Sequence, residues 1–180
     1  MKKFLAVVII VGLGCFLLCP FSFAATAEKI DQNADESLAL FKEVKGADAV
    51  IEKAAGILVF PKVIKAGIGI GGEYGEGALR INGRTVDYYS TAAASIGLQL
   101  GAQKKTIIIA FMDKDALDNF RNSTGWKVGV DASVAVVAIG AGGAIDSSEI
   151  NEPIIGFIFD QKGLMYNLTL EGAKITKLEK

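Results

Sequence analysis

Four residues that directly follow Pro61 carry a pattern that could bind a ligand. Lys62 and Lys65 flank the apolar pair Val63 and Ile64. An anionic phospholipid headgroup requires ammonium groups close to exposed apolar side chains. We therefore predict a lipid-binding site at Lys62, Val63, Ile64 and Lys65. The other interpretation of this pattern is a solvated strand edge that binds nothing.

This chain of 180 residues has few side chains suited to catalysis, because it contains no histidine. That absence removes the commonest general base and the Ser-His-Asp and Cys-His nucleophile pairs. It also removes most catalytic zinc sites. Serine, lysine and carboxylates remain, but no Gly-x-Ser-x-Gly nucleophile elbow occurs. We predict a protein that is not an enzyme, with no catalytic residues, no metal site and no cofactor.

Charge and composition narrow the possible partners. Nineteen basic residues stand against 20 acidic ones, so the net charge is −1. Nucleic acid needs a clustered basic surface, so we expect no nucleic-acid partner. Apolar residues make up 51% of the chain and charged residues 22%, as in a packed globular protein. The length favours one folded domain.

The glycine-rich stretch at residues 67–77 has two interpretations. Its glycines are Gly67, Gly69, Gly71, Gly72, Gly75 and Gly77. Three of them match the dinucleotide-binding pattern Gly-x-Gly-x-x-Gly, which must open a helix. Residues 73–77 are poor helix formers that lead into a hairpin. We therefore predict that these glycines are structural, in a strongly curved strand that another part of the backbone approaches closely.

Residues 1–24 are typical of an export signal. Lys2 and Lys3 precede an uncharged apolar run of about 15 residues, which is short of the roughly 20 needed to span a bilayer. A small-x-small sequence ends at Ala24, and Ala27 offers a second cleavage position. We predict cleavage at one of these positions and export to the periplasm or cell envelope. A retained membrane anchor and a lipoprotein acylated at Cys15 are less favoured, the latter because Gly12 replaces the branched residue of a lipobox.

Hydrophobic periodicity divides the remaining chain into a helical segment over residues 25–55 and a β-rich domain over residues 56–180. Within the β-rich part, Asn82-Gly83 predicts a tight hairpin, and residues 106–112 a central strand. We expect further strands at residues 57–60, which Pro61 ends, at 96–100 and at 128–136, and a hairpin of 154–159 with 164–170 through 160–163. Lys104 and Lys105 are expected in a turn, and Trp126 to be partly buried.

Three aspartates stand close together at Asp113, Asp115 and Asp118. Their spacing lacks the glycine and closing glutamate of a calcium-binding loop. We predict instead a short helix capped by Asp113 or Asp115 and anchored by Leu117 and Phe120. The elements together predict an α+β fold with a single strongly curved, mostly antiparallel, barrel-like sheet, N-terminal helices and one mid-chain helix.

Six short segments stand in a characteristic order, at residues 55–67, 75–79, 95–101, 111–120, 140–143 and 162–164. Together they resemble the SYLF domain family, over roughly residues 40–172. The resemblance implies lipid binding; eukaryotic members bind phosphoinositides, and a yeast relative binds actin. The chain departs from the family pattern at residues 83–89, where many members carry a tryptophan and a proline.

Lipid or envelope association is what the resemblance implies. Together with the predicted export signal and the lack of catalytic residues, it leads us to expect an exported, non-enzymatic lipid-binding domain acting at the cell envelope. Its partner would be phospholipid or a membrane surface. The alternative is a periplasmic structural or protein–protein interaction module with an envelope protein as partner.

Overall fold

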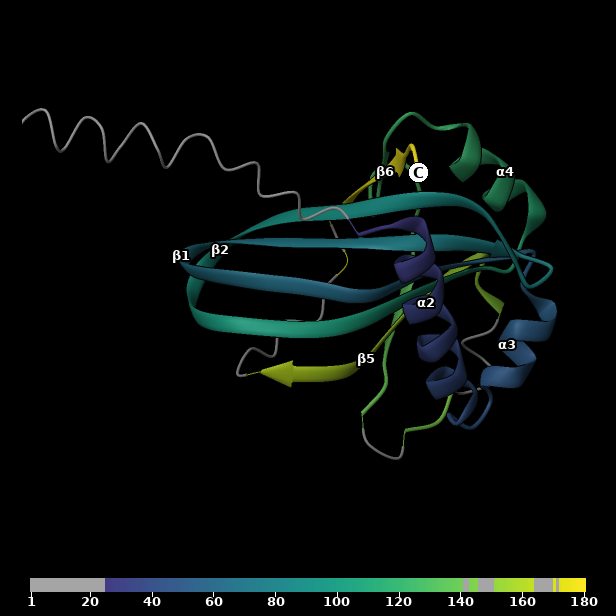
Figure 1. The fold of residues 1–180 in the computed structure, drawn as a ribbon, viewed down its shortest axis with the longest axis horizontal. Coiled ribbons are helices and arrows are strands. Elements are labelled where there is room, and N and C mark those ends of the chain that lie inside the picture. Colours follow the sequence, from purple (N-terminus) through teal and green to yellow (C-terminus); the bar gives the residue numbers. More distant parts are fainter. Residues whose placement is uncertain (1–24, 141–142, 146–150, 164–169, 171) are drawn as a thin grey trace, which may run out of the picture.

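The computed structural model describes residues 25–140, 143–145, 151–163, 170 and 172–180 (Figure 1). Their elements, in chain order, are α2 (Ala27–Lys42), α3 (Ala47–Lys53), β1 (Gly56–Ile81), β2 (Arg84–Phe111), α4 (Lys114–Asn122), β3 (Trp126–Lys127), β4 (Ala135–Ala138), β5 (Ile154–Gly163) and β6 (Lys174–Leu178). The two predicted N-terminal helices and the predicted mid-chain helix are all present.

One long hairpin organises the sheet. β1 and β2 pair antiparallel from Gly56 opposite Phe111 to Ile81 opposite Arg84. The turn between them is the predicted one, because Asn82 and Gly83 have φ angles of 51° and 75°. Asparagine and glycine tolerate this left-handed conformation better than other residues. Figure 1 shows the hairpin bending back on itself at the end that lies away from α3.

The bend lets one strand pair with different neighbours along its length. Residues 88–92 of β2 pair with β6, whereas residues 103–111 of β2 pair with β5. Among the described residues, the strands form a sheet in the order β3-β6-β2-β5-β4, with β1 paired to β2. All of these pairs are antiparallel except β4 with β5. The structure thus confirms the α+β fold with a strongly curved, mostly antiparallel sheet.

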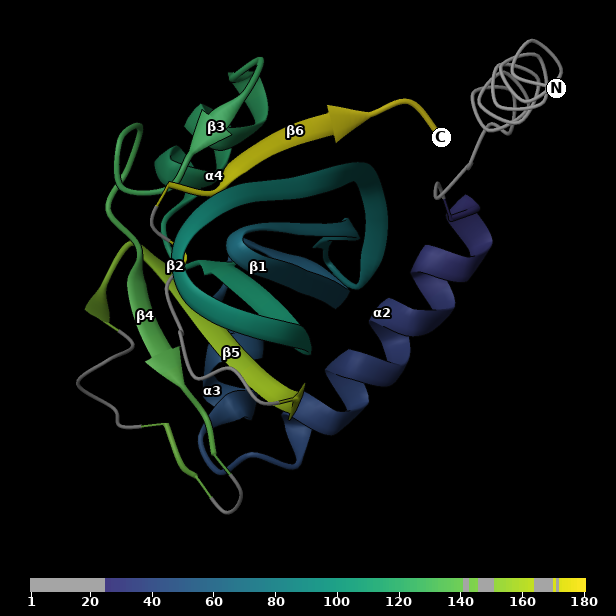
Figure 2. The same cartoon turned by 90° about the vertical axis from the view of Figure 1, so that its left-hand side faces the viewer.

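Each face of the sheet has its own core. The face enclosed by the bend packs Leu58, Phe60 and Phe111 against Phe120 of α4 and the buried Trp126. The opposite face packs against α2 and α3 through the residues Ile30, Ala34, Phe41, Val50, Val59, Ala78, Ile108 and Phe157. Figure 2 shows β2 curving around β1, with α2 lying beside the curl.

Some predicted strand ends are wrong. β1 continues through Pro61, because a register shift between Phe60 and Val63 spares the proline from donating to the ladder. Lys104 and Lys105 lie within β2 rather than in a turn.

The predicted strand over residues 128–136 is interrupted. Gly129 has a φ of 81°, and the carboxylate of Asp131 accepts a hydrogen bond from the Lys127 amide at 2.6 Å. These contacts form a turn between β3 and β4. The predicted turn at residues 160–163 belongs to β5, and its expected partner strand falls on residues 164–169, which lie outside the described residues.

The predicted cap of α4 is confirmed. The Asp113 carboxylate accepts a hydrogen bond from the Asp115 amide at 2.7 Å, while Leu117 and Phe120 are buried. A side-chain oxygen at this position satisfies one of the amide groups that have no partner within the helix. Asp113 therefore has a structural role at the start of α4.

Candidate functional site

A groove of about 770 Å³ lies between the N-terminal half of α2 and one face of β1. The helix contributes one wall and the two halves of β1 form the floor. The residues that line it are Ala25, Lys29, Ile30, Asn33, Pro61, Lys62, Ile64, Ala66, Gly72, Glu73, Tyr74, Gly75 and Glu76. Most of the surface of this lining is apolar, and Lys29 and Lys62 contribute exposed ammonium groups at its rim.

The predicted lipid-binding residues are divided between the two faces of β1. Lys62 is exposed and Ile64 is 45% exposed, and both line the groove. Val63 and Lys65 are buried on the opposite face, with 0% and 4% exposure. The predicted arrangement of four neighbouring contact residues is therefore wrong. Side chains alternate along a strand, so two lysines three positions apart point to opposite faces.

The charges around the groove are unevenly compensated. The Glu73 carboxylate lies 2.9 Å from the Lys105 ammonium, and that of Glu76 lies 3.1 Å from Lys180. By contrast, Lys29 donates to the neutral side chain of Gln32 at 3.1 Å. Among the described residues, Lys29 and Lys62 form no ion pair with a carboxylate. The groove thus presents two uncompensated positive charges at its rim.

Polar contacts hold the helical wall of the groove in place. The Asp31 carboxylate accepts hydrogen bonds from Thr85 at 2.6 Å and Tyr88 at 2.8 Å. Arg80 of β1 reaches the Asp35 carboxylate at 2.8 Å. Burial, followed by the hydrogen bond and charge of Asp31, raises the pKa of Tyr88, so this phenol remains a donor. The acidic face of α2 therefore docks on the sheet.

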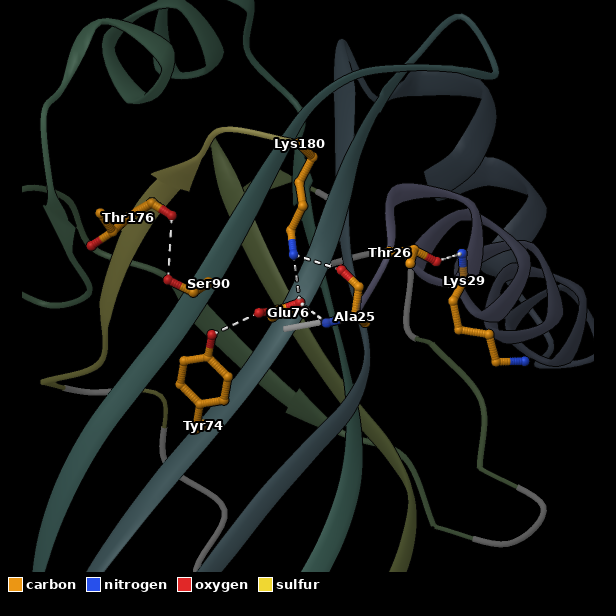
Figure 3. Close-up of polar contacts among 8 residues, drawn as sticks. All are labelled: Ala25, Thr26, Lys29, Tyr74, Glu76, Ser90, Thr176 and Lys180. Carbon is orange, nitrogen blue, oxygen red and sulfur yellow. Dashed lines mark hydrogen bonds and ion pairs between the residues drawn. The ribbon is translucent and has the colours of Figure 1, made fainter. Parts of the chain in front are cut away.

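Glu76 is the centre of a second set of contacts, drawn in Figure 3. Its carboxylate accepts hydrogen bonds from the Tyr74 hydroxyl at 2.9 Å, the Ala25 amide at 2.9 Å and the Lys180 ammonium at 3.1 Å. Burial and the adjacent Glu76 raise the pKa of Tyr74 to about 12. Glu76 therefore joins the start of α2, strand β1 and the end of the described chain.

Buried polar side chains of β1 and β2 gather on the face of the hairpin that points away from the groove. Lys65, Gln103 and Lys105 are 4%, 2% and 1% exposed. Gln103 donates to Gln161 at 3.3 Å, and Lys105 pairs with Glu73. Lys65 is enclosed with this group, which is why it cannot meet a membrane surface together with Lys62.

The predicted structural glycines have different surroundings. A Cβ atom at Gly77 would overlap the Val59 carbonyl, and one at Gly75 would overlap Val63. These two glycines therefore let the second half of β1 lie directly against the first half. A Cβ at Gly67 would overlap Gly71 at the bend, Gly69 lies at the register shift between Ile68 and Ile70, and Gly72 faces open space.

Several residues at the groove could not be predicted from local sequence patterns. Lys29 lies in the predicted helical segment of residues 25–55, but nothing in the sequence indicated where its ammonium group would lie. Glu76 and Lys180 are 104 positions apart, so only the folded chain brings them together. The one available signal is the period of two, which assigns Lys62, Ile64 and Ala66 to a common face of β1.

Two features of the described residues bear on the kind of site. No helix there is both long enough and apolar enough to cross a membrane. Nor does this part of the chain contain a group of three or more histidine, cysteine, aspartate or glutamate side chains that could hold a metal ion.

Comparison with known proteins finds one family model that matches the second half of the chain. Residues 92–180 match the model of the Ysc84 family, which is described as "Las17-binding protein actin regulator". No match was found among curated proteins. The matched segment begins in β2 and includes α4 and β3 to β6, so it contains Lys180 but none of the residues that line the groove. The match to the Ysc84 model over residues 92–180 is consistent with the resemblance to the SYLF domain family seen in the sequence.

Proposed function

We propose that this protein is an exported, non-enzymatic domain that binds anionic phospholipid at the cell envelope. The observation that carries the proposal is the groove beside α2, which combines an apolar lining with two uncompensated ammonium groups. An apolar channel suits an acyl chain, and lysines at its rim suit a phosphate. Lys62 and Ile64 are retained from the predicted site, and Lys29 joins them.

Flotation of the protein with vesicles tests this proposal. Phosphatidylglycerol vesicles are compared with phosphatidylcholine vesicles, because the latter carry no net charge. Each lysine near an anionic surface contributes about 1 kcal/mol. Replacing Lys29→Ala and Lys62→Ala together should therefore weaken binding to the anionic vesicles roughly thirtyfold at low salt. The loss should shrink as salt rises, because exposed charges are screened.

The matched control is Lys42→Ala with Lys53→Ala, which removes two exposed lysines outside the groove. This control should float as the parent does. Equal loss in both double variants would indicate a diffuse charge effect and contradict the groove. Failure of the parent to float would remove the lipid proposal.

A protein-interaction module is the second candidate, because the family description names a protein, Las17, as its binding partner. Strand β4 could provide the contact surface for such a partner protein. Its outer edge is unpaired among the described residues, and Val136 on it is 42% exposed. An added strand from a partner could pair with such an edge. If vesicles fail to bind the parent, this candidate takes precedence.

A further inference from the structure

Three groups that are far apart in the sequence meet beside the groove (Figure 3). The Ala25 amide nitrogen donates to the Glu76 carboxylate at 2.9 Å, and the Lys180 ammonium donates to the Ala25 carbonyl at 2.6 Å. The side chains of Glu76 and Lys180 are only 7% and 11% exposed. The backbone of Ala25 is thus held on both its donor and its acceptor side.

Ala25 also directly follows the first predicted cleavage position. Hydrolysis of the peptide bond between residues 24 and 25 would use one water molecule. The hydroxyl would go to the carbonyl carbon of Ala24, and the proton to the nitrogen of Ala25. The neutral amide that now faces Glu76 would thus become an amine with two N–H bonds. The new carboxylic acid of Ala24 releases its proton at neutral pH, and the amine takes up a proton, which gives an α-ammonium group with three N–H donors and a positive charge.

We propose that Ala25 is the N-terminal residue of the processed protein and that Glu76 is the binding site for its α-ammonium group. Removal of the leader thereby converts a hydrogen bond into an ion pair. The same step adds a positive charge at the groove, which Ala25 lines. This inference rests on the export part of the proposed function, and it requires no lipid binding.

The contacts distinguish the two predicted cleavage positions. Thr26 is the N-cap of α2, since its hydroxyl oxygen accepts a hydrogen bond from the Lys29 amide at 3.3 Å. Cleavage after Ala27 would remove both this cap and Ala25. Cleavage after Ala24 keeps the cap and creates the charge that Glu76 can bind.

Glu76 matters more after cleavage than before it. The charged or titratable groups around the new ammonium are Glu76 and Tyr74 on β1, Lys180 after β6, and Glu28 and Lys29 on α2. The positive end of the α2 dipole also lies there. Without Glu76, the α-ammonium group of Ala25 would lie beside the positive Lys180 side chain and the positive end of α2, and it would lose its carboxylate partner.

The pH dependence follows from the α-amino group, whose ordinary pKa is about 7.7–8.0. An amine that gains a carboxylate partner in the folded state contributes stability below that pKa. The contribution disappears as the pH rises and the amine becomes neutral. The ion pair should therefore stabilise the processed protein at pH 6 and not at pH 10.

A full chain in which a specific protease site replaces residues 21–24 tests the proposal, because the same preparation is measured before and after cleavage. The contacts described for the fold lie within residues 25–180, so the cleaved chain retains them. At pH 6, Glu76→Gln should lower Tm by about 2–4 °C more in the cleaved form than in the uncleaved form. This difference should vanish at pH 10.

Glu52→Gln is the matched control, since Glu52 is exposed on α3 and should have the same effect in both forms. An equal effect of Glu76→Gln in both forms at pH 6 would overturn the proposal. A second measurement needs no substitution. The Ala25 amine should react with an amine reagent at pH 7 about tenfold more slowly than a free peptide amine. Equal rates would also overturn it. Neither measurement involves vesicles, so this inference and the lipid proposal can fail separately.

Discussion

Gly77 illustrates how one residue sets the curvature of the sheet. Its α-hydrogen faces the Val59 carbonyl and the Phe60 ring, in a space that a methyl group would overlap. The bent β1 strand can lie against itself because this side chain is missing. The glycine content of residues 67–77 predicted such an approach, but not which glycine makes it.

Replacing Gly77→Ala should destabilise the protein by about 1–3 kcal/mol, because the new methyl group forces backbone apart in a packed core. Gly72→Ala is the matched control, since open space surrounds that position. It should change stability by no more than about 0.5 kcal/mol. Urea denaturation of the two variants measures both values. Equal stability of the two variants would contradict the close approach within β1.

The predicted positions of two lysines were wrong, for different reasons. Lys65 was expected beside Lys62 in a surface contact, and Lys105 in a turn, yet both are buried. Strand periodicity alone places Lys62 and Lys65 on opposite faces. The partner of Lys105, however, is Glu73, 32 positions away, and no local pattern predicts that pair.

At the scale of elements, the buried pair of Glu73 and Lys105 joins β1 to β2. The two charged groups lie 2.9 Å apart, and their side chains are 7% and 1% exposed. A buried ammonium that loses its carboxylate partner remains desolvated without compensation. The pair therefore makes the register of this part of the hairpin costly to change.

Glu73→Gln should lower the free energy of unfolding by about 3–5 kcal/mol, because it leaves the Lys105 charge buried alone. Replacing both residues, as Glu73→Leu with Lys105→Met, should recover most of that loss. Chemical denaturation of the single and double variants gives the comparison. A single variant as stable as the parent would show that the ammonium has another partner.

Element types were more predictable than element boundaries. The Asn82-Gly83 turn, the α4 cap and the N-terminal helices depend on local chemistry, and each is present. β1 was expected to end at Pro61, but a register shift carries it on to Ile81. Pairing with β2 decides that continuation, and pairing is a long-range property.

At the scale of the whole molecule, the curved sheet was predictable, whereas the groove was not. Small residues and alternating strands indicated curvature, and the structure has it. The groove forms because α2 docks on the sheet through two of its residues. The Asp31 carboxylate accepts a hydrogen bond from Thr85 of β2, and Ile30 packs into the core on that face. The outer face of β1 remains open beyond the helix. The match to the Ysc84 family begins at residue 92, so it describes the scaffold rather than the groove.

We propose that this groove holds an anionic phospholipid, and native mass spectrometry of the protein purified from its native source would detect that lipid. The parent should carry an added mass equal to one phospholipid. Ala66→Trp should lose that mass, because the ring would fill the groove from an exposed position, while Ala92→Trp, exposed outside it, should retain it. A parent without bound phospholipid, or an Ala66→Trp variant that retains it, would show that the groove is not a phospholipid site.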